Sequence, residues 1–73
     1  MTPLSLLPKG TRAKIIQIDA GRGLEGRLKH MGLYQGEVIK VVQNTEGPVV
    51  VAKGGMRLAL GRGMSQKVLV EEI

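Results

Sequence analysis

The side chain best suited to chemistry in this 73-residue chain is His30, its one histidine. An imidazole can bind a transition metal, but a protein metal site usually needs about three or four ligands. Because the chain has no cysteine, carboxylates such as Asp19, Glu25 and Glu37, or methionines, would have to complete the site. We therefore predict that His30 is an exposed residue at a helix C-terminus, favourably placed against the helix dipole. A weak or shared transition-metal site at His30 is the alternative.

The four methionines are a second set of potential ligands, because thioethers bind soft ions such as Cu(I). Met31 and Met56, however, fall on predicted core faces, where a flexible side chain fills gaps in an aliphatic interior. We predict no set of metal-binding residues.

Gly21, Gly23 and Gly26 have the spacing of the dinucleotide-binding fingerprint and lie at the start of a predicted helix. That fingerprint requires a βαβ unit with an acidic residue about 20 positions further on. Lys40 and Val41 occupy that region here. The chain also has no P-loop, no nucleophile elbow and no Ser-His-Asp set. We therefore predict neither a bound cofactor nor an enzyme activity.

Four residues are predicted to form a partner surface: Arg27, Lys29, Tyr34 and Arg57. Arg27 and Lys29 lie off the apolar stripe of the predicted helix, and Tyr34 is the only aromatic residue of the chain. Tyrosine and arginine are among the residues that most often carry the energy of an interface. The alternative is that these residues are ordinary solvated surface.

The charge of the chain favours an anionic partner. Lysine and arginine number 11 against 6 aspartates and glutamates, which gives a net charge of +5. Such a charge suits an acidic protein patch, a nucleic acid or a lipid surface. The basic residues are scattered, and only one aromatic side chain could stack on a base. A small barrel that binds nucleic acid is therefore the second hypothesis.

Length and composition predict one cytoplasmic domain spanning residues 1–73. A chain of this size has too small a core for a deep substrate cleft of its own. The absence of cysteine fits a reducing compartment. The longest apolar run, Val49 to Ala52, is too short to span a bilayer, and Met1 to Leu7 lacks the features of a signal peptide.

One helix is predicted from about Arg22 to His30, with its apolar stripe formed by Leu24, Leu28 and Met31. Gly32 follows where a helix commonly ends in the left-handed conformation, and Leu33 would then pack on Leu28. Gly36 is predicted to turn the chain into the next strand.

Short strands are predicted for the rest of the chain. The expected ranges are 11–18, with a bulge or two covered faces at Ile15–Ile16, then 37–42, 49–52, 56–60 and 67–71. Gly54-Gly55 is predicted to form a hairpin turn, after which Met56, Leu58 and Leu60 face inward. Helical turns are expected at residues 4–7, capped by Thr2-Pro3, and at residues 61–66. The predicted fold is mainly β: a small, partly open barrel of about five strands with one short helix and one or two helical turns.

The order of these signals resembles the FeoA proteins of bacterial ferrous iron uptake. The resemblance covers nearly the whole chain and rests most specifically on Arg27-Leu28-Lys29-His30-Met31-Gly32-Leu33 followed by Gly36. Pro8-Lys9-Gly10 after a leucine-rich turn, Gly47-Pro48 before a valine strand, and Leu58-Ala59-Leu60 also match. Gln35 replaces a common proline and Ala20 a common glycine, and neither position carries a chemical group.

The resemblance implies an SH3-like barrel that serves as a cytosolic accessory of FeoB, a ferrous iron transporter of the membrane with a cytosolic GTP-binding domain. It implies protein contact rather than catalysis. A similar module forms the C-terminal domain of metal-dependent repressors of the diphtheria-toxin-repressor type, so a metal-responsive regulatory module is a third hypothesis. An exposed edge strand in a partly open barrel would leave homo-oligomers possible.

Overall fold

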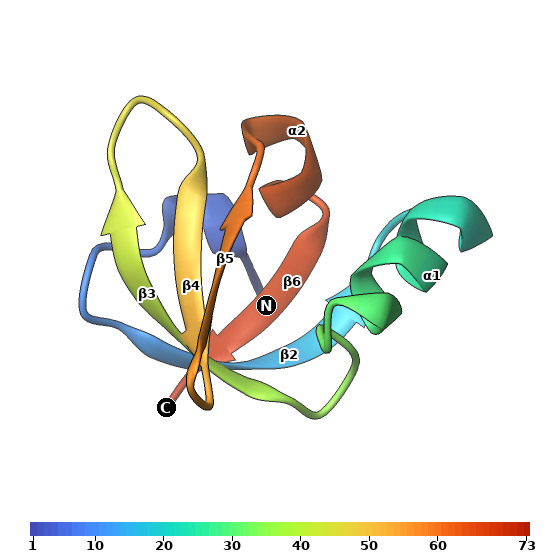
Figure 1. Cartoon of the computed structure of the whole chain (residues 1–73), viewed down its shortest axis with the longest axis horizontal. Helices are drawn as coiled ribbons and strands as arrows, with labels where there is room; N and C mark the ends of the chain where they lie inside the picture. The colour runs from blue at the N-terminus through green and yellow to red at the C-terminus, as the bar shows by residue number, and fades with distance from the viewer.

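The computed structural model describes residues 1–73 as six strands that curl around an aliphatic core, with helices at the ends (Figure 1). The strands are β1 (Thr2–Pro3), β2 (Arg12–Ile18), β3 (Val38–Asn44), β4 (Val49–Lys53), β5 (Met56–Leu60) and β6 (Val68–Glu72). The helices are the 3-10 turn η1 (Leu4–Leu6), α1 (Arg22–His30) and α2 (Arg62–Ser65). The predicted mainly β architecture is confirmed. None of the three helices has the length and apolar character needed to cross a membrane.

All neighbouring strands are antiparallel, in the order β1-β6-β2-β3-β4-β5, so the sheet is open and β1 and β5 are its edges. The structure has one strand more than the five predicted. Thr2 and Pro3, which were expected to cap a helical turn, instead pair with Val70 and Leu69 of β6. No side chain caps η1. Proline is acceptable in β1 because an edge strand has one side without a partner.

The predicted bulge in β2 is present, because the pairing of β2 with β6 shifts register between Ile15 and Gln17. A second bulge, which the sequence analysis did not identify, shifts the pairing of β3 with β4 between Val41 and Gln43. A bulge bends its strand and increases the local twist. The two bulges thus help a narrow sheet to curl around its core.

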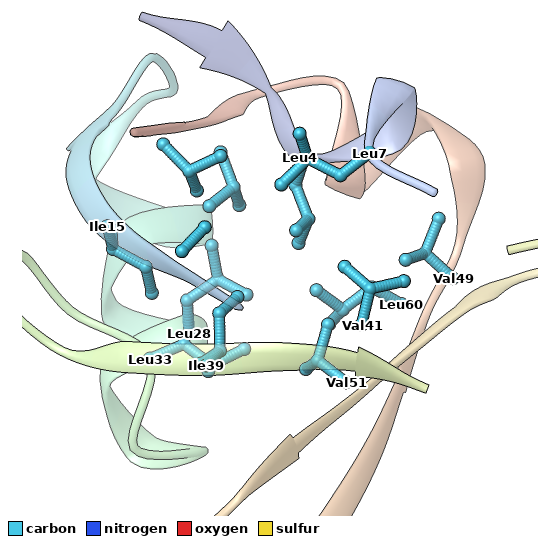
Figure 2. Close-up of a cluster of buried hydrophobic side chains, with 13 residues drawn as sticks. Leu4, Leu7, Ile15, Leu28, Leu33, Ile39, Val41, Val49, Val51 and Leu60 are labelled. Atoms are coloured by element: carbon cyan, nitrogen blue, oxygen red, sulfur yellow. The ribbon is translucent and has the colours of Figure 1, made fainter. Parts of the chain in front are cut away.

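The core is a single cluster of 13 buried residues, all aliphatic. Figure 2 shows Leu28, Leu33 and Ile39 grouped at one end of this cluster, with Val41, Val49, Val51 and Leu60 at the other. Leu28 and Leu33 are fully buried, so the helix α1 is held against the barrel by its own stripe. The core therefore fixes the position of α1 relative to the strands.

The end of α1 has the predicted geometry. Gly32 has a φ of +83°, its N–H donates to the carbonyl of Lys29 over 2.9 Å, and the N–H of Leu33 donates to the carbonyl of Leu28 over 2.8 Å. These are the two hydrogen bonds of a Schellman stop, and the buried Leu28 and Leu33 supply its apolar contact. The second predicted bend is also present, because Gly36 has a φ of +96°.

Replacing Gly32 by alanine is expected to lower the free energy of unfolding by about 1–2 kcal/mol, because a Cβ disfavours the left-handed conformation. The new Cβ would also lie 2.8 Å from Nζ of Lys53 and would displace that flexible side chain. Gly26→Ala is the matched control, since a Cβ there meets nothing within 4 Å and α1 gains a better helix former. Urea unfolding should show opposite signs for the two variants. A stabilised Gly32→Ala protein would contradict the prediction.

A polar cluster joins three segments that are far apart in the sequence. The Asn44 side-chain amide donates to the carbonyls of Ser5 and Leu7, over 3.0 and 2.6 Å, and its oxygen accepts from Arg62 over 2.7 Å. Arg62 also donates to the carbonyl of Ser5 over 3.3 Å. Asn44 and Arg62 thus tie the end of β3 and the start of α2 to η1.

Candidate functional site

The four residues predicted for a partner surface are all exposed, but the structure does not bring them together. Lys29 and Tyr34 line the same hollow beside α1. Arg27 lies about 160° around the helix from Lys29, since 3.6 residues make one turn. Arg57 lies on the outward-facing side of β5, and a different hollow contains it. Of the four residues predicted for one surface, only Lys29 and Tyr34 therefore lie together.

The hollow beside α1 has a volume of about 500 Å³. Its walls come from the bulged end of β2, from α1 and from the turn after the helix, and its lining residues are Ile16, Gln17, Ile18, Glu25, Lys29, Tyr34 and Gln35. Polar and apolar side chains alternate around it, and both charges are present. Such a surface suits contact with a partner better than enclosure of a small substrate, because binding sites for small molecules are mostly apolar and concave.

Lys53 occupies a central place that the sequence analysis did not identify. Its ammonium group lies 3.3 Å from Oε2 of Glu37 and 5.0 Å from the centre of the Tyr34 ring. The side chain crosses from the end of β4 to the turn that follows α1, and passes over Gly32. The cluster of Tyr34, Glu37 and Lys53 therefore joins two segments of the fold, the turn before β3 and the end of β4.

The charges of this cluster change the proton affinities of its members. The pKa of Tyr34 is raised, because its hydroxyl donates a hydrogen bond to the Glu37 carboxylate and because that negative charge opposes a phenolate. The pKa of Glu37 is lowered, first by the hydrogen bond from Tyr34 and then by the one from Lys53. The stabilisation from Glu37 is thus complete above the ordinary glutamate pKa and is lost as the pH falls through its lowered value. The stabilisation from Tyr34 is complete below the ordinary tyrosine pKa and is lost as the pH rises through its raised value.

Replacing Glu37 by glutamine is expected to lower the pKa of Tyr34, because Glu37 is the main cause of its increase. The chain has one tyrosine and no tryptophan, so the tyrosinate absorbance reports this single group directly. Glu25→Gln is the control, because Glu25 lines the hollow that contains Tyr34 but is not a cause of its shift. If Glu37→Gln leaves the titration midpoint of Tyr34 unchanged, the cluster does not form in solution.

A second groove, of about 410 Å³, lies between the end of α1 and the hairpin of β4 and β5. His30, Met31, Lys53, Met56 and Leu58 are among the residues that line it. The prediction that Met56 fills a gap in the core is wrong, since its side chain is 57% exposed. Met56 pairs with Lys53 at the hairpin end of the sheet, where the strands extend past the core. Met31 does pack against the core.

His30 is exposed at the end of α1, as predicted. The structure has no group of three or more His, Cys, Asp or Glu side chains arranged to hold a metal ion. The neighbours of His30 in the groove are two methionines, a lysine and glycines rather than carboxylates. The hollow and the groove around the end of α1 thus offer cations, amides and exposed apolar side chains.

The comparisons with known proteins agree on one family. The FeoA domain model matches residues 2–72. The Fe(2+) transport protein A of Methanocaldococcus jannaschii is 39% identical over 72 residues, which are 99% of this chain and 88% of that protein. A crystal structure of the iron uptake regulatory protein FeoA has a TM-score of 0.91 at 32% identity, over 99% of this chain and 96% of that one.

Two further structures bear on the fold. A zinc complex of FeoA from Stenotrophomonas maltophilia, described as an SH3 domain protein, has a TM-score of 0.78 at 27% identity, over 97% of this chain and 91% of that one. The manganese regulator SloR has a TM-score of 0.88 at 14% identity, over 99% of this chain and 34% of its own, and this likeness shows the fold alone. The predicted SH3-like fold is thereby confirmed.

Proposed function

The chain belongs to the FeoA domain family, and from that premise we propose that it is a cytoplasmic accessory protein of ferrous iron uptake that contacts a FeoB-type transporter. The name of the Methanocaldococcus jannaschii relative, Fe(2+) transport protein A, is the observation that carries the proposal. The Stenotrophomonas maltophilia FeoA is described as a candidate activating factor of bacterial ferrous iron transport. The role proposed here is a non-catalytic one.

We propose that the contact is made by a surface that we call the helix-stop face, formed by Lys29, Tyr34, Lys53 and Met56. Lys29 and Tyr34 share one hollow, Lys53 and Met56 share the neighbouring groove, and Lys53 lies over the Tyr34 ring. The exposed Tyr34 and the adaptable Met56, on the two sides of Lys53, supply the apolar contact that an interface core requires. The ion pair of Lys53 with Glu37 holds the lysine in place without closing the surface.

The net charge of +5 supports an acidic contact surface on the transporter. Charge complementarity of this kind mainly raises the association rate. The rate should therefore fall when salt is raised to about 0.5 M, where screening acts over only a few ångströms. An association rate that does not depend on salt would contradict an acidic contact surface on the transporter, but it would not contradict the contact itself.

The decisive experiment is an amide NMR titration of this protein with the cytosolic domain of its cognate transporter. Shifts are expected at residues 29–36 and 53–56. Tyr34→Ala should weaken binding about tenfold or more, as expected for an aromatic anchor. Gln43→Ala, an exposed change in β3 outside the hollow and the groove of the helix-stop face, is the matched control and should bind normally. Binding that leaves both ranges unshifted would contradict the contact face, and no binding at high concentration would contradict the contact itself.

A further inference from the structure

The outward-facing side of the sheet carries a row of cations that the partner contact does not use. The strand register places Arg12 of β2 opposite Lys40 of β3, Lys40 opposite Ala52 of β4, and Ala52 opposite Arg57 of β5. Arg12, Lys40 and Arg57 are exposed, and the residues that precede and follow them along the strands are mostly core residues. The three cations therefore point away from the core on one face.

Two more cations extend this row into a patch. Lys9 lines a hollow together with Lys40 and Arg57. Lys14 follows Arg12 by two residues in β2, so both side chains lie on the same side of that strand. We call these five residues the outer basic patch: Lys9, Arg12, Lys14, Lys40 and Arg57. Adjacent strands lie about 4.8 Å apart, so the row from Arg12 to Arg57 spans about 14 Å along the sheet.

Almost none of the positive charge of the outer basic patch is neutralised by carboxylates of the same chain. The one ion pair of the structure joins Lys53 to Glu37, and neither belongs to the patch. Glu71 lies opposite Lys14 in β6, but the two make no ion pair. Like charges directly opposite each other on neighbouring strands, as in Arg12 and Lys40, destabilise a sheet. An anionic surface placed against the patch would remove this repulsion.

We propose that the outer basic patch docks the protein on the anionic headgroups of a lipid bilayer. A patch spread over four strands on the convex side of a curled sheet matches a surface of headgroups better than a single strand of phosphates. Binding of single-stranded nucleic acid usually combines cations with aromatic stacking platforms, and the one aromatic residue, Tyr34, belongs to the helix-stop face.

A protein partner is also a poorer match for this patch than lipid. The outward neighbours of its cations are small aliphatic residues such as Val38, Ala52 and Ala59. Protein interfaces usually also bury large aromatic anchors at their centre, and Arg12 and Arg57 have none beside them, since the one aromatic residue, Tyr34, belongs to the helix-stop face. Basic residues without such anchors are the usual composition of a surface that binds anionic lipid, where each Lys or Arg strengthens binding roughly fivefold.

Sedimentation with lipid vesicles tests this inference without any transporter, so its failure would leave the proposed function standing. The vesicles contain phosphatidylcholine alone or with roughly a third phosphatidylglycerol, and the salt is about 0.01 or 0.5 M, which changes the Debye length from about 30 Å to a few ångströms. Binding is expected only to the anionic vesicles at low salt. No binding under that condition would overturn the inference.

Matched variants separate the contribution of the outer basic patch to vesicle binding from the contribution of net charge. The triple substitution Arg12→Gln, Lys40→Gln and Arg57→Gln should weaken vesicle binding on the order of 100-fold, since three fivefold factors multiply. The control Arg22→Gln, Arg27→Gln and Lys67→Gln removes the same charge from exposed positions outside both surfaces and should bind nearly as the wild type does.

Equal losses in the two triple variants would show that only net charge matters and would overturn the docking face. Tighter binding to duplex DNA or to an acidic protein than to anionic vesicles, lost in the patch variant alone, would assign the patch to that other partner. Far-ultraviolet circular dichroism should show that both variants are folded. Relief of the repulsion between Arg12 and Lys40 predicts unchanged or slightly raised stability for the patch variant.

Discussion

Replacing Leu28 by alanine is expected to lower the free energy of unfolding by about 2–5 kcal/mol, as for other buried leucines. Leu28 is fully buried, and its carbonyl accepts the N–H of Leu33 at the helix stop. A domain of this size is stable by about 4–11 kcal/mol in total, at typical values per residue. The loss is therefore a large fraction of the total stability, and the variant should unfold at a clearly lower urea concentration than the wild type.

The measurement is urea unfolding followed by circular dichroism, because the chain has no tryptophan for fluorescence. Leu24→Ala is the matched control, being the same substitution on the same stripe of α1. Leu24 is only partly buried against the core, so the loss there should be less than half as large. Equal losses in the two variants would show that Leu28 does not anchor the helix.

Replacing Asn44 by alanine is expected to lower the free energy of unfolding by about 1–3 kcal/mol, the range for leaving buried polar groups without partners. The substitution removes the hydrogen bonds to the carbonyls of Ser5 and Leu7 and leaves Arg62 without its side-chain acceptor. Gln43→Ala, an exposed change in the same strand, should alter stability by less than about 0.5 kcal/mol.

Asn44→Asp distinguishes the two halves of this cluster. The carboxylate would keep and strengthen the bond from Arg62, but it cannot donate to the two carbonyls of η1. We expect a clear loss of stability despite the new ion pair. A protein as stable as the wild type would show that Arg62, rather than η1, is the partner that matters.

Much of the fold follows from local chemistry that the sequence shows. The range of α1 and its stop at Gly32 depend on neighbouring residues and were predicted correctly, and the bulge in β2 was one of the two alternatives predicted at Ile15–Ile16. The strand β1 was missed because two residues are too few to show the alternation of apolar and polar side chains that marks a strand. They form a strand only by pairing with β6. The exposure of Met56 was missed because alternation gives the side of a strand but not where the core ends.

The candidate sites depend more than the fold does on which distant residues the tertiary structure brings together. Tyr34 and Lys29 were selected by residue type, and whether they contact a partner stays a prediction. Lys53 reaches Tyr34 and Glu37 from a strand that is distant in the sequence, and no local pattern indicates this contact. The alignment of Arg12, Lys40 and Arg57 requires the register of four strands, and alternation alone does not determine register.

The place of β6 in the sheet affects how the protein is made in the cell. β6 contains residues 68–72, yet it lies between β1 and β2, which belong to the first quarter of the chain. During synthesis, β1 and β2 therefore leave the ribosome long before the strand that joins them, and their edges remain open until then. Pairings between such distant segments also form slowly. The barrel must thus be completed after translation of residue 72, so the sheet cannot close while the chain is still being made.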